Sequence, residues 1–367
     1  GLGDVYKRQS MEAGNAVKKG ILAAKPDAEV VVSPLADGGE GTVDALIEGL
    51  GAEKIPVTVA GPLGEKVSCY YGFLEETKTA VMEMASAAGI TLVTKKDPLR
   101  ASTYGVGEMI ADALKRGCKN FMIGIGGSAT NDGGIGMLKA LGFEFFDEDG
   151  NDVGEGAAAL AKIEVIRTEN KNPLLSGAKF QIACDVKNPL CGKQGATYIF
   201  GSQKGVTEEQ KDQIDEAMRH YADVTKESLG CDFADCEGAG AAGGLGYAFL
   251  SYLAGELIPG VELILHATGL EEKMKNADVV VTGEGRLDAQ TVMGKAPVGV
   301  AALAKKYNAK VIAFAGSVAP EASVCNQAGI DAFFPIVRGV TTLEEAMKKE
   351  NAMENIAATA EQVFRLL

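Results

Sequence analysis

Glycines and short polar side chains are concentrated in residues 124–134, which read Gly-Ile-Gly-Gly-Ser-Ala-Thr-Asn-Asp-Gly-Gly. An apolar run at residues 120–125 leads into this stretch, and a helical pattern at residues 135–141 follows it. Glycines let the backbone approach a ligand closely, and free N–H groups at a helix N-terminus suit an anion. We therefore expect the loop to bind a phosphate or a carboxylate, the alternative being a tight, capped turn. The expected binding residues are Gly126, Gly127, Ser128, Ala129, Thr130, Asn131 and Asp132.

Two further polar loops follow expected strands. Residues 34–42 follow an apolar strand expected over 28–33, and they contain Asp37 and Gly38. Residues 282–291 follow a strand expected over 277–282, and Lys295 comes shortly after this loop. Open α/β sheets bind ligands beyond the carboxyl ends of their strands, so all three loops are candidates for one site.

Acidic side chains at strand ends suggest the chemistry of that site. They are Asp37, Asp132, Asp185, Glu284 and Asp288, with the cations Arg286 and Lys295 close by in the sequence. Phosphoryl transfer needs carboxylates for Mg²⁺, a base for the acceptor hydroxyl and a cation for the developing charge. We assign Asp185 or Asp288 to the metal or the base, and Arg286 to the phosphoryl group or to a carboxylate of the acceptor. Helix caps at Asp37 and Asp132, and a surface pair between Arg286 and Glu284 or Asp288, are the structural alternatives.

Composition excludes several classes of protein. The chain has 367 residues, enough for two domains, and a formal net charge of −14, which argues against nucleic-acid binding. No apolar run approaches the ~20 residues of a membrane span, and there is no signal-peptide pattern, so we expect a cytoplasmic protein. The seven cysteines and two histidines lack the spacing of a zinc site.

The order of expected elements indicates an α/β fold with a discontinuous domain. Strands and helices alternate at both ends of the chain, whereas three consecutive antiparallel strands are expected between residues 57 and 84. We predict a parallel-sheet domain at 1–56 and 270–367 and an inserted mixed α/β domain at 57–269. Residues 1–9 resemble a translated sequencing adapter, and we expect the first native helix to begin at Ser10.

Common nucleotide-binding motifs do not account for these loops. Gly124, Gly126 and Ala129 match G-x-G-x-x-A, but no acidic ribose-binding residue follows at a strand end. No G-x-x-x-x-G-K-[ST] motif and no protein-kinase motif set are present.

Four motifs together resemble the bacterial type I glycerate kinase family. They are Gly-Gly-Ser-Ala-Thr-Asn-Asp-Gly-Gly, Leu-Ala-Asp-Gly-Gly-Glu-Gly-Thr, Cys-Asp-Val-Lys-Asn-Pro-Leu and Gly-Glu-Gly-Arg-Leu-Asp. The resemblance implies ATP-dependent phosphorylation of D-glycerate and a flavodoxin-like domain interrupted by a second α/β domain. The family's opening strand and its Pro-Asp-Ser-Phe-Lys segment are replaced here by the adapter-like residues.

Two alternatives remain beside a kinase that uses ATP, Mg²⁺ and glycerate. One is an inactive sugar-acid-binding or regulatory protein, motivated by the altered N-terminal segment. The other is a dehydrogenase, motivated by the G-x-G-x-x-A match alone.

Overall fold

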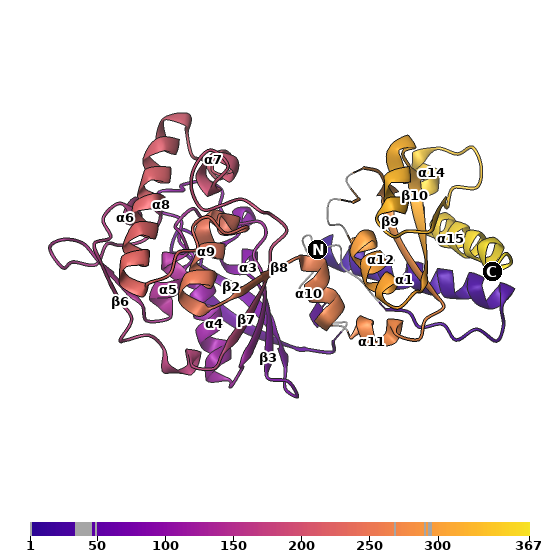
Figure 1. Ribbon diagram of the computed structural model, residues 1–367, viewed down its shortest axis with the longest axis horizontal. Coiled ribbons are helices and arrows are strands. Elements are labelled where there is room, and N and C mark those ends of the chain that lie inside the picture. Colours follow the sequence, from indigo (N-terminus) through magenta and orange to yellow (C-terminus); the bar gives the residue numbers. More distant parts are fainter. Residues whose placement is uncertain (1, 34–45, 48–49, 268, 290, 293–295) are drawn as a thin grey trace. The chain divides into compact units, whose positions relative to one another are not determined.

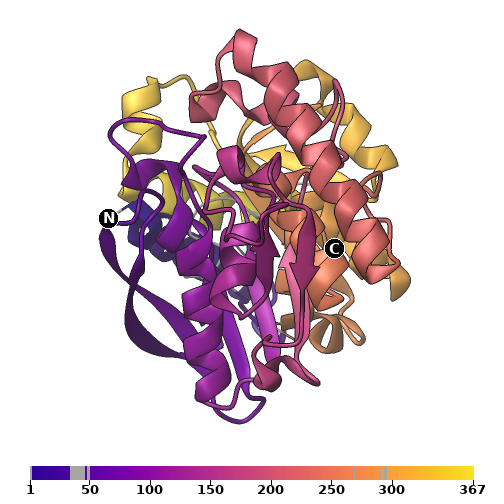
Figure 2. The same cartoon turned by 90° about the vertical axis from the view of Figure 1, so that its left-hand side faces the viewer.

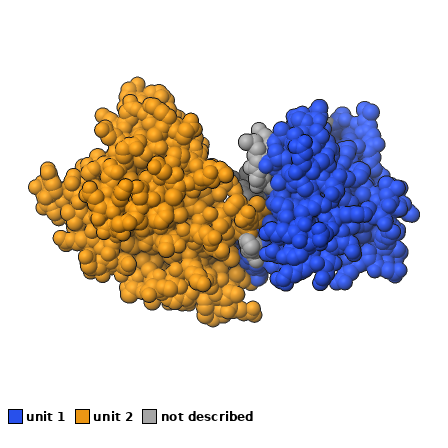
Figure 3. Space-filling model, in the orientation of Figure 1, with its two compact units in different colours: residues 1–50, 264–367 blue, residues 51–263 orange. Residues whose placement is uncertain are grey.

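The computed structural model describes residues 2–33, 46–47, 50–267, 269–289, 291–292 and 296–367. The chain forms two compact units, coloured separately in Figure 3. Unit 1 comprises residues 1–50 and 264–367, and unit 2 comprises residues 51–263. The bounds expected from the sequence, 56/57 and 269/270, remain our prediction for the domain boundaries.

Unit 2 carries the glycine-rich loop and contains both strands and helices (Figure 1). Its strands are β1 (Glu53–Ala60), β2 (Lys66–Leu74), β3 (Thr79–Glu83), β4 (Asn120–Gly124), β5 (Glu144–Phe146), β6 (Val165–Arg167), β7 (Lys179–Ala183) and β8 (Glu256–Ile258). Its helices are α3 (Ala85–Ala88), η1 (Ile90–Leu92), α4 (Tyr104–Lys115), α5 (Ile135–Ala140), α6 (Ala157–Leu160), η2 (Pro173–Leu175), α7 (Ala196–Phe200), η3 (Ser202–Lys204), α8 (Glu208–Leu229) and α9 (Ala241–Leu253).

The main sheet of unit 2 is mixed, with the strand order β1-β2-β3-β4-β7-β8. The pairs β1–β2 and β2–β3 are antiparallel, which confirms the three consecutive antiparallel strands expected from the sequence. The pairs β3–β4, β4–β7 and β7–β8 are parallel. The carboxyl ends of four neighbouring strands therefore lie at one edge of this sheet.

One face of the sheet packs on helices. Phe121, Ile123, Phe180 and Ile182 are buried in a single core with apolar residues of α4, α5 and α9. Figure 2 shows α4, in purple, lying along the strands. Because alternate strand residues point to opposite faces, this buried set anchors β4 and β7 and fixes where their carboxyl ends emerge.

Unit 1 is built from both ends of the chain. Its strands are β9 (Val279–Leu287), β10 (Lys310–Val318) and β11 (Ala332–Pro335). Its helices are α1 (Leu2–Ala24), α11 (Leu270–Met274), α12 (Ala296–Lys306), η4 (Pro320–Ser323), α13 (Val324–Gln327), α14 (Leu343–Met347) and α15 (Lys349–Phe364), while α10 (Gly260–Ala267) spans the boundary between the units. The three strands pair in parallel in the order β11-β10-β9.

Helices α1 and α15 lie side by side in unit 1 (Figure 1). They meet closely at Gly20, where an added Cβ would lie 2.1 Å from the Ala357 carbonyl oxygen. Ile21, Phe314, Val363 and other apolar residues form a core between these helices and the sheet.

Three local expectations are wrong. Residues 28–33 form no strand within the described part of unit 1; Val30 packs on the apolar core without a ladder of hydrogen bonds. Helix α1 begins at Leu2 rather than at Ser10. Residues 283–287, expected in a loop, extend strand β9 because their backbone pairs with β10, including Glu284 with Ala315 and Arg286 with Ser317.

The described helices include none that is long and apolar enough to cross a membrane. The expected α/β class is confirmed, with a mixed sheet in unit 2 and a parallel sheet in unit 1. The wider flavodoxin-like topology of unit 1 remains a prediction.

Candidate active site

The glycine-rich loop connects the end of β4 to the start of α5, as expected from the sequence. Gly127, Gly133 and Gly134 have φ angles of 70°, 63° and 79°. Side chains other than glycine rarely adopt this left-handed region, so the glycines allow the chain to turn sharply within a few residues.

Two hydrogen bonds hold the start of the loop against the segment between α3 and η1. Ile90 N donates to the Gly127 carbonyl oxygen at 2.8 Å, and Ala129 N donates to the Ala88 carbonyl oxygen at 2.9 Å. In a planar trans peptide the C=O and the next N–H point in opposite directions. The Gly127 carbonyl points towards Ile90 N, so the N–H of Ser128 points away from Ile90.

The first half of the loop forms a cradle, by which we mean the exposed Gly126 and Gly127 together with the buried Ser128. Gly126 and Gly127 are exposed, and Ser128 is 6% exposed. Among the described residues, no acceptor pairs with the N–H groups of these three residues. Free N–H groups on an exposed glycine turn can bind a phosphate or carboxylate oxygen.

The second half of the loop lies inside the protein. Thr130, Asn131 and Asp132 are each 0% exposed, and Ala129 is 4% exposed. Their burial keeps these side chains from the surface, and binding of an anion by the backbone N–H groups of residues 128–132 remains a prediction. Within residues 124–134, the exposed residues are Gly126 and Gly127.

Asp132 acts as a buried cap for helix α5. Its carboxylate accepts hydrogen bonds from Thr103 N and Thr103 Oγ1, both at 2.8 Å, from Gly134 N at 3.1 Å and from Gly136 N at 3.3 Å. Burial raises the pKa of this carboxyl, and the four donors oppose that shift. The structural alternative for Asp132, a helix cap, is what the geometry shows.

The second glycine-rich stretch, residues 238–246, packs against the first. A Cβ at Gly243 would lie 2.1 Å from the Thr130 carbonyl oxygen, and one at Gly244 would lie 2.7 Å from Gly133 Cα. Gly133 N also donates to the Gly243 carbonyl oxygen at 2.9 Å. Packing between backbones, rather than ligand contact, explains these glycines.

Lys204 is a residue that sequence reasoning missed. It is 2% exposed, and its Nζ donates to the Thr130 carbonyl oxygen at 2.7 Å. Burial lowers the pKa of its ammonium to about 7, opposed by the negative charge of Asp132. The only signal in the sequence is a lysine directly before a glycine in Gly-Ser-Gln-Lys-Gly.

Two carboxylates lie at the ends of the strands beside β4. Glu83 ends β3 opposite Gly124, and a Cβ on Gly124 would be 3.0 Å from Glu83 Oε1. Asp185 lies two residues after the end of β7, is exposed, and accepts a hydrogen bond from Gly260 N at 2.8 Å. Both strands pair in parallel with β4, so Glu83, the cradle and Asp185 occupy one edge of the sheet. Glu83 was also missed by sequence reasoning, because it reads as the last residue of a strand.

Unit 1 contains the charged residues at the end of β9, which are Glu284, Arg286 and Asp288. Glu284 accepts a hydrogen bond from the hydroxyl of Thr291, which is fully buried. Arg286 Nε lies 3.6 Å from Asp288 Oδ2, and the two side chains are 65% and 20% exposed. The structure brings these three charged side chains to one end of β9. Asp37, Gly38 and Lys295 lie outside the described residues.

Asp185 has the properties of a Mg²⁺ ligand in a site where waters and substrate phosphates supply the other ligands. The described residues contain no cluster of three or more His, Cys, Asp or Glu side chains that could hold a metal. Mg²⁺, however, is commonly held by one or two carboxylates together with waters and substrate phosphates. The exposed carboxylate of Asp185 meets that requirement.

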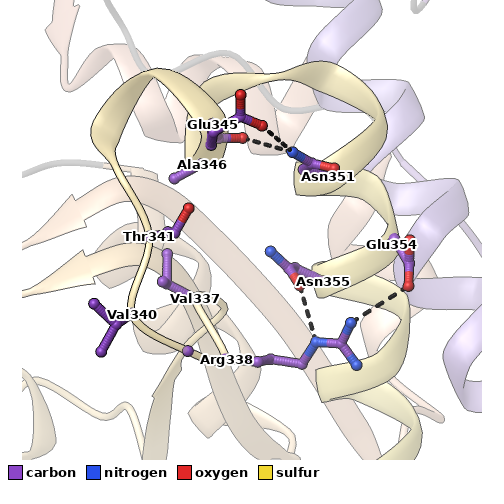
Figure 4. A pocket seen from close by; sticks show the side chains of 10 residues that line it. Val337, Arg338, Val340, Thr341, Glu345, Ala346, Asn351, Glu354 and Asn355 are labelled. Carbon is purple, nitrogen blue, oxygen red and sulfur yellow. Dashed lines mark hydrogen bonds and ion pairs between the residues drawn. The ribbon is translucent and has the colours of Figure 1, made fainter.

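A pocket of about 350 Å³ lies elsewhere in unit 1, between the chain after β11 and helices α14 and α15 (Figure 4). Its cation is already paired: Arg338 Nε donates to Asn355 Oδ1 at 2.9 Å, and Arg338 Nη2 lies 3.5 Å from Glu354 Oε1. None of the expected site residues lines this pocket.

Together, the strand–loop–helix and the carboxylates beside it define an α/β protein with a polar, glycine-rich loop at the carboxyl edge of its sheet, the edge where open α/β sheets bind ligands. The chain belongs to the glycerate kinase family, whose model matches residues 5–367.

Several relatives match nearly the whole chain. A glycerate kinase of Bacillus subtilis is 45% identical over 356 residues, covering 96% of this chain and 93% of the relative. A glycerate 2-kinase of Escherichia coli is 45% identical over 365 residues, covering 97% and 96%. The crystal structure of a putative glycerate kinase 2 from Salmonella typhimurium is 42% identical, with a TM-score of 0.86 and coverage of 97% and 94%. The resemblance noted in the sequence is confirmed at the level of the family.

Proposed function

We propose that this protein is a glycerate kinase, which transfers the γ-phosphoryl group of ATP to a hydroxyl of D-glycerate and forms phosphoglycerate and ADP. Family membership over almost the whole chain supports the reaction. The observation that carries the site assignment is the cradle, whose three N–H groups have no acceptor among the described residues.

In this reaction a glycerate hydroxyl oxygen attacks the γ-phosphorus. The bond from that phosphorus to the bridging oxygen of ADP breaks, and the hydroxyl proton passes to a carboxylate. The cradle would hold an oxyanion of one substrate by backbone donation. We assign the proton acceptor to Asp185 or Asp288.

Asp185 would also be a ligand for Mg²⁺, together with phosphate oxygens of ATP. When bound, the ion neutralises charge on those oxygens. Arg286 would pair with the transferring phosphoryl group or with the glycerate carboxylate, because its planar fork can contact two oxygens at once. Asp37, Gly38, Glu284 and Lys295 remain proposed as binding residues, and a cytoplasmic location, where ATP is supplied, belongs to the same proposal.

An assay of ADP release coupled to a visible readout, with D-glycerate as the acceptor, tests this function. ADP release that depends on D-glycerate supports it. Binding of D-glycerate by calorimetry without ADP release would instead favour a binding or regulatory protein. Binding of NAD(H) without ADP release would favour a dehydrogenase.

A further inference from the structure

Lys204 is a lysine buried inside unit 2, where its ammonium donates a hydrogen bond to a backbone carbonyl rather than facing solvent. Its side chain lies inside unit 2, and its Nζ donates to the carbonyl of Thr130, 74 residues earlier in the chain. Burying an ammonium costs free energy unless the charge is compensated. The Thr130 carbonyl and the negative charge of Asp132 compensate this cost only in part, since burial still lowers the pKa of Lys204 to about 7. A lysine at this buried position therefore needs a reason.

The consecutive helices α7 and η3 form two hydrogen bonds with the buried second half of the glycine-rich loop. Besides the bond from Lys204 to Thr130, Asn131 Nδ2 donates to Thr197 Oγ1 at 3.0 Å. Thr197 lies on α7, and Lys204 ends η3. Residues 197–204 thus hold the buried second half of the loop in place, while the first half forms the cradle.

Two polar atoms beside this contact remain unpaired. Thr130 Oγ1 and Asn131 Oδ1 are buried and have no hydrogen-bond partner among the described residues. Buried polar atoms are nearly always paired, and an unpaired one needs an explanation, such as strain, a catalytic role or a bound water or ion. The unpaired atoms lie in the same loop as the cradle, and Lys204 of η3 donates a hydrogen bond to that loop.

We propose that Lys204 is a positioning residue for the cradle: it fixes the loop through the Thr130 carbonyl and places a positive charge within the protein behind the N–H groups that bind a substrate oxyanion. This inference rests on the proposed function, because it assumes that the cradle binds such a group. The oxyanion is a carboxylate if D-glycerate occupies the cradle and a phosphate if ATP does.

A bound oxyanion in the same loop would favour the charged form of Lys204. The pKa of this group is lowered by burial to about 7, and the other charge acting on it is that of Asp132. Near neutral pH, oxyanion binding should therefore be accompanied by partial protonation of Lys204. A purely structural lysine would show no such coupling.

The experiment is calorimetric titration of the full chain with D-glycerate and, separately, with a non-hydrolysable ATP analogue. Each titration is run near pH 7.5 in two buffers of different ionisation enthalpy, which gives the number of protons taken up. For the ligand that occupies the cradle, the wild type should take up a fraction of a proton. Lys204→Met should abolish that uptake and weaken binding of the same ligand at least tenfold.

Two further variants separate the possible roles. Lys204→Arg keeps a permanent charge, so binding should stay within a few fold of the wild type while proton uptake disappears. Lys193→Met is the matched control, because Lys193 lies nearby in sequence but its side chain is 77% exposed; it should change neither quantity.

Wild-type affinity and proton uptake for both ligands in Lys204→Met would overturn the proposal. If that variant does not fold, unchanged proton uptake in Lys204→Arg would overturn it equally. The proposed function fails separately, if the wild type binds D-glycerate but releases no ADP.

Discussion

Thr103 donates two hydrogen bonds to one carboxylate oxygen of Asp132, from its backbone N and from its hydroxyl, each at 2.8 Å. The hydroxyl also accepts a bond from Met137 N at 2.9 Å. The start of α4 and the start of α5 are therefore joined through one buried carboxylate, which fixes the loop between β4 and α5.

We expect Asp132→Asn to reduce stability more than it reduces substrate affinity. The amide can accept on one side only, so a buried donor loses its partner at a cost of about 1–3 kcal/mol in the free energy of unfolding. Denaturant unfolding and Michaelis constants measured on the same sample check this prediction. A tenfold rise in a Michaelis constant without loss of stability would show that Asp132 contacts a substrate.

Substitution of Asp185 or Asp288 by Asn should identify the catalytic carboxylate. The amide keeps the shape and removes the negative charge, so at least one of the two variants should lose about a hundredfold or more in turnover. Asp152→Asn is a suitable control, because the Asp152 side chain is 53% exposed and is already paired with Lys139. If both site variants lose only two- or threefold, the proton acceptor is another residue, and Glu83 becomes the next to test.

Arg286→Lys should lower turnover by on the order of a hundredfold if Arg286 contacts the transferring phosphoryl group. The Arg286 side chain is 65% exposed, so its pairing with Asp288 contributes at most about 1 kcal/mol and the melting temperature should change little. A rise in the Michaelis constant for glycerate that exceeds the loss of turnover would place Arg286 at the carboxylate instead.

Arg338→Lys is the matched control for Arg286→Lys, since Arg338 lies in the same unit and forms an exposed pair with Glu354. Unchanged kinetics together with a lowered melting temperature in Arg286→Lys would make Arg286 structural.

The stability of the protein should depend on pH through Lys204. Its pKa is about 7 in the folded state, whereas the unfolded value is about 10.4. Between these values the unfolded chain binds more protons, so the free energy of unfolding rises with pH. The charged group that acts on Lys204 is Asp132, which is itself fully buried.

The difference in free energy of unfolding between the wild type and Lys204→Met isolates this effect from other titrating groups. It should rise by up to about 1.4 kcal/mol per pH unit between about pH 8 and 10. Denaturant unfolding at several pH values measures the slope, and a flat difference would mean that Lys204 stays charged in the folded protein.

Much of unit 2 could be predicted from local patterns. The loop at 124–134 has an apolar strand before it and a helical repeat after it, and both neighbours form as expected. The antiparallel strands β1, β2 and β3 also follow from their composition and turns.

Contacts between distant segments account for what local patterns missed. Gly283 and Gly285 indicate a loop, yet the paired strand β10 keeps this backbone extended. An added Cβ at Gly283 would lie 2.5 Å from the Phe314 carbonyl oxygen, so the glycine serves close packing between strands. Lys204 reaches Thr130 across 74 residues, and no local pattern marks such a contact.

The structure also shows which loop glycine gives the clearest test of the cradle. Gly127 has a φ of 70°, so a valine there would strain the backbone as well as block a ligand. Gly126 has no such φ, is exposed, and an added Cβ would meet no atom within 4 Å. Gly126→Val therefore adds a side chain to the cradle itself, and we expect little effect on folding.

The rate of ADP release with D-glycerate, compared between the wild type and Gly126→Val, tests the central claim most directly. We predict ADP release by the wild type that depends on D-glycerate, and a loss of about a hundredfold in kcat/KM for Gly126→Val, equivalent to about 2.7 kcal/mol of transition-state stabilisation. The melting temperature of the variant should stay within a few degrees of the wild type. Wild-type kcat/KM in Gly126→Val, or no ADP release by the wild type in the presence of D-glycerate, would contradict the account.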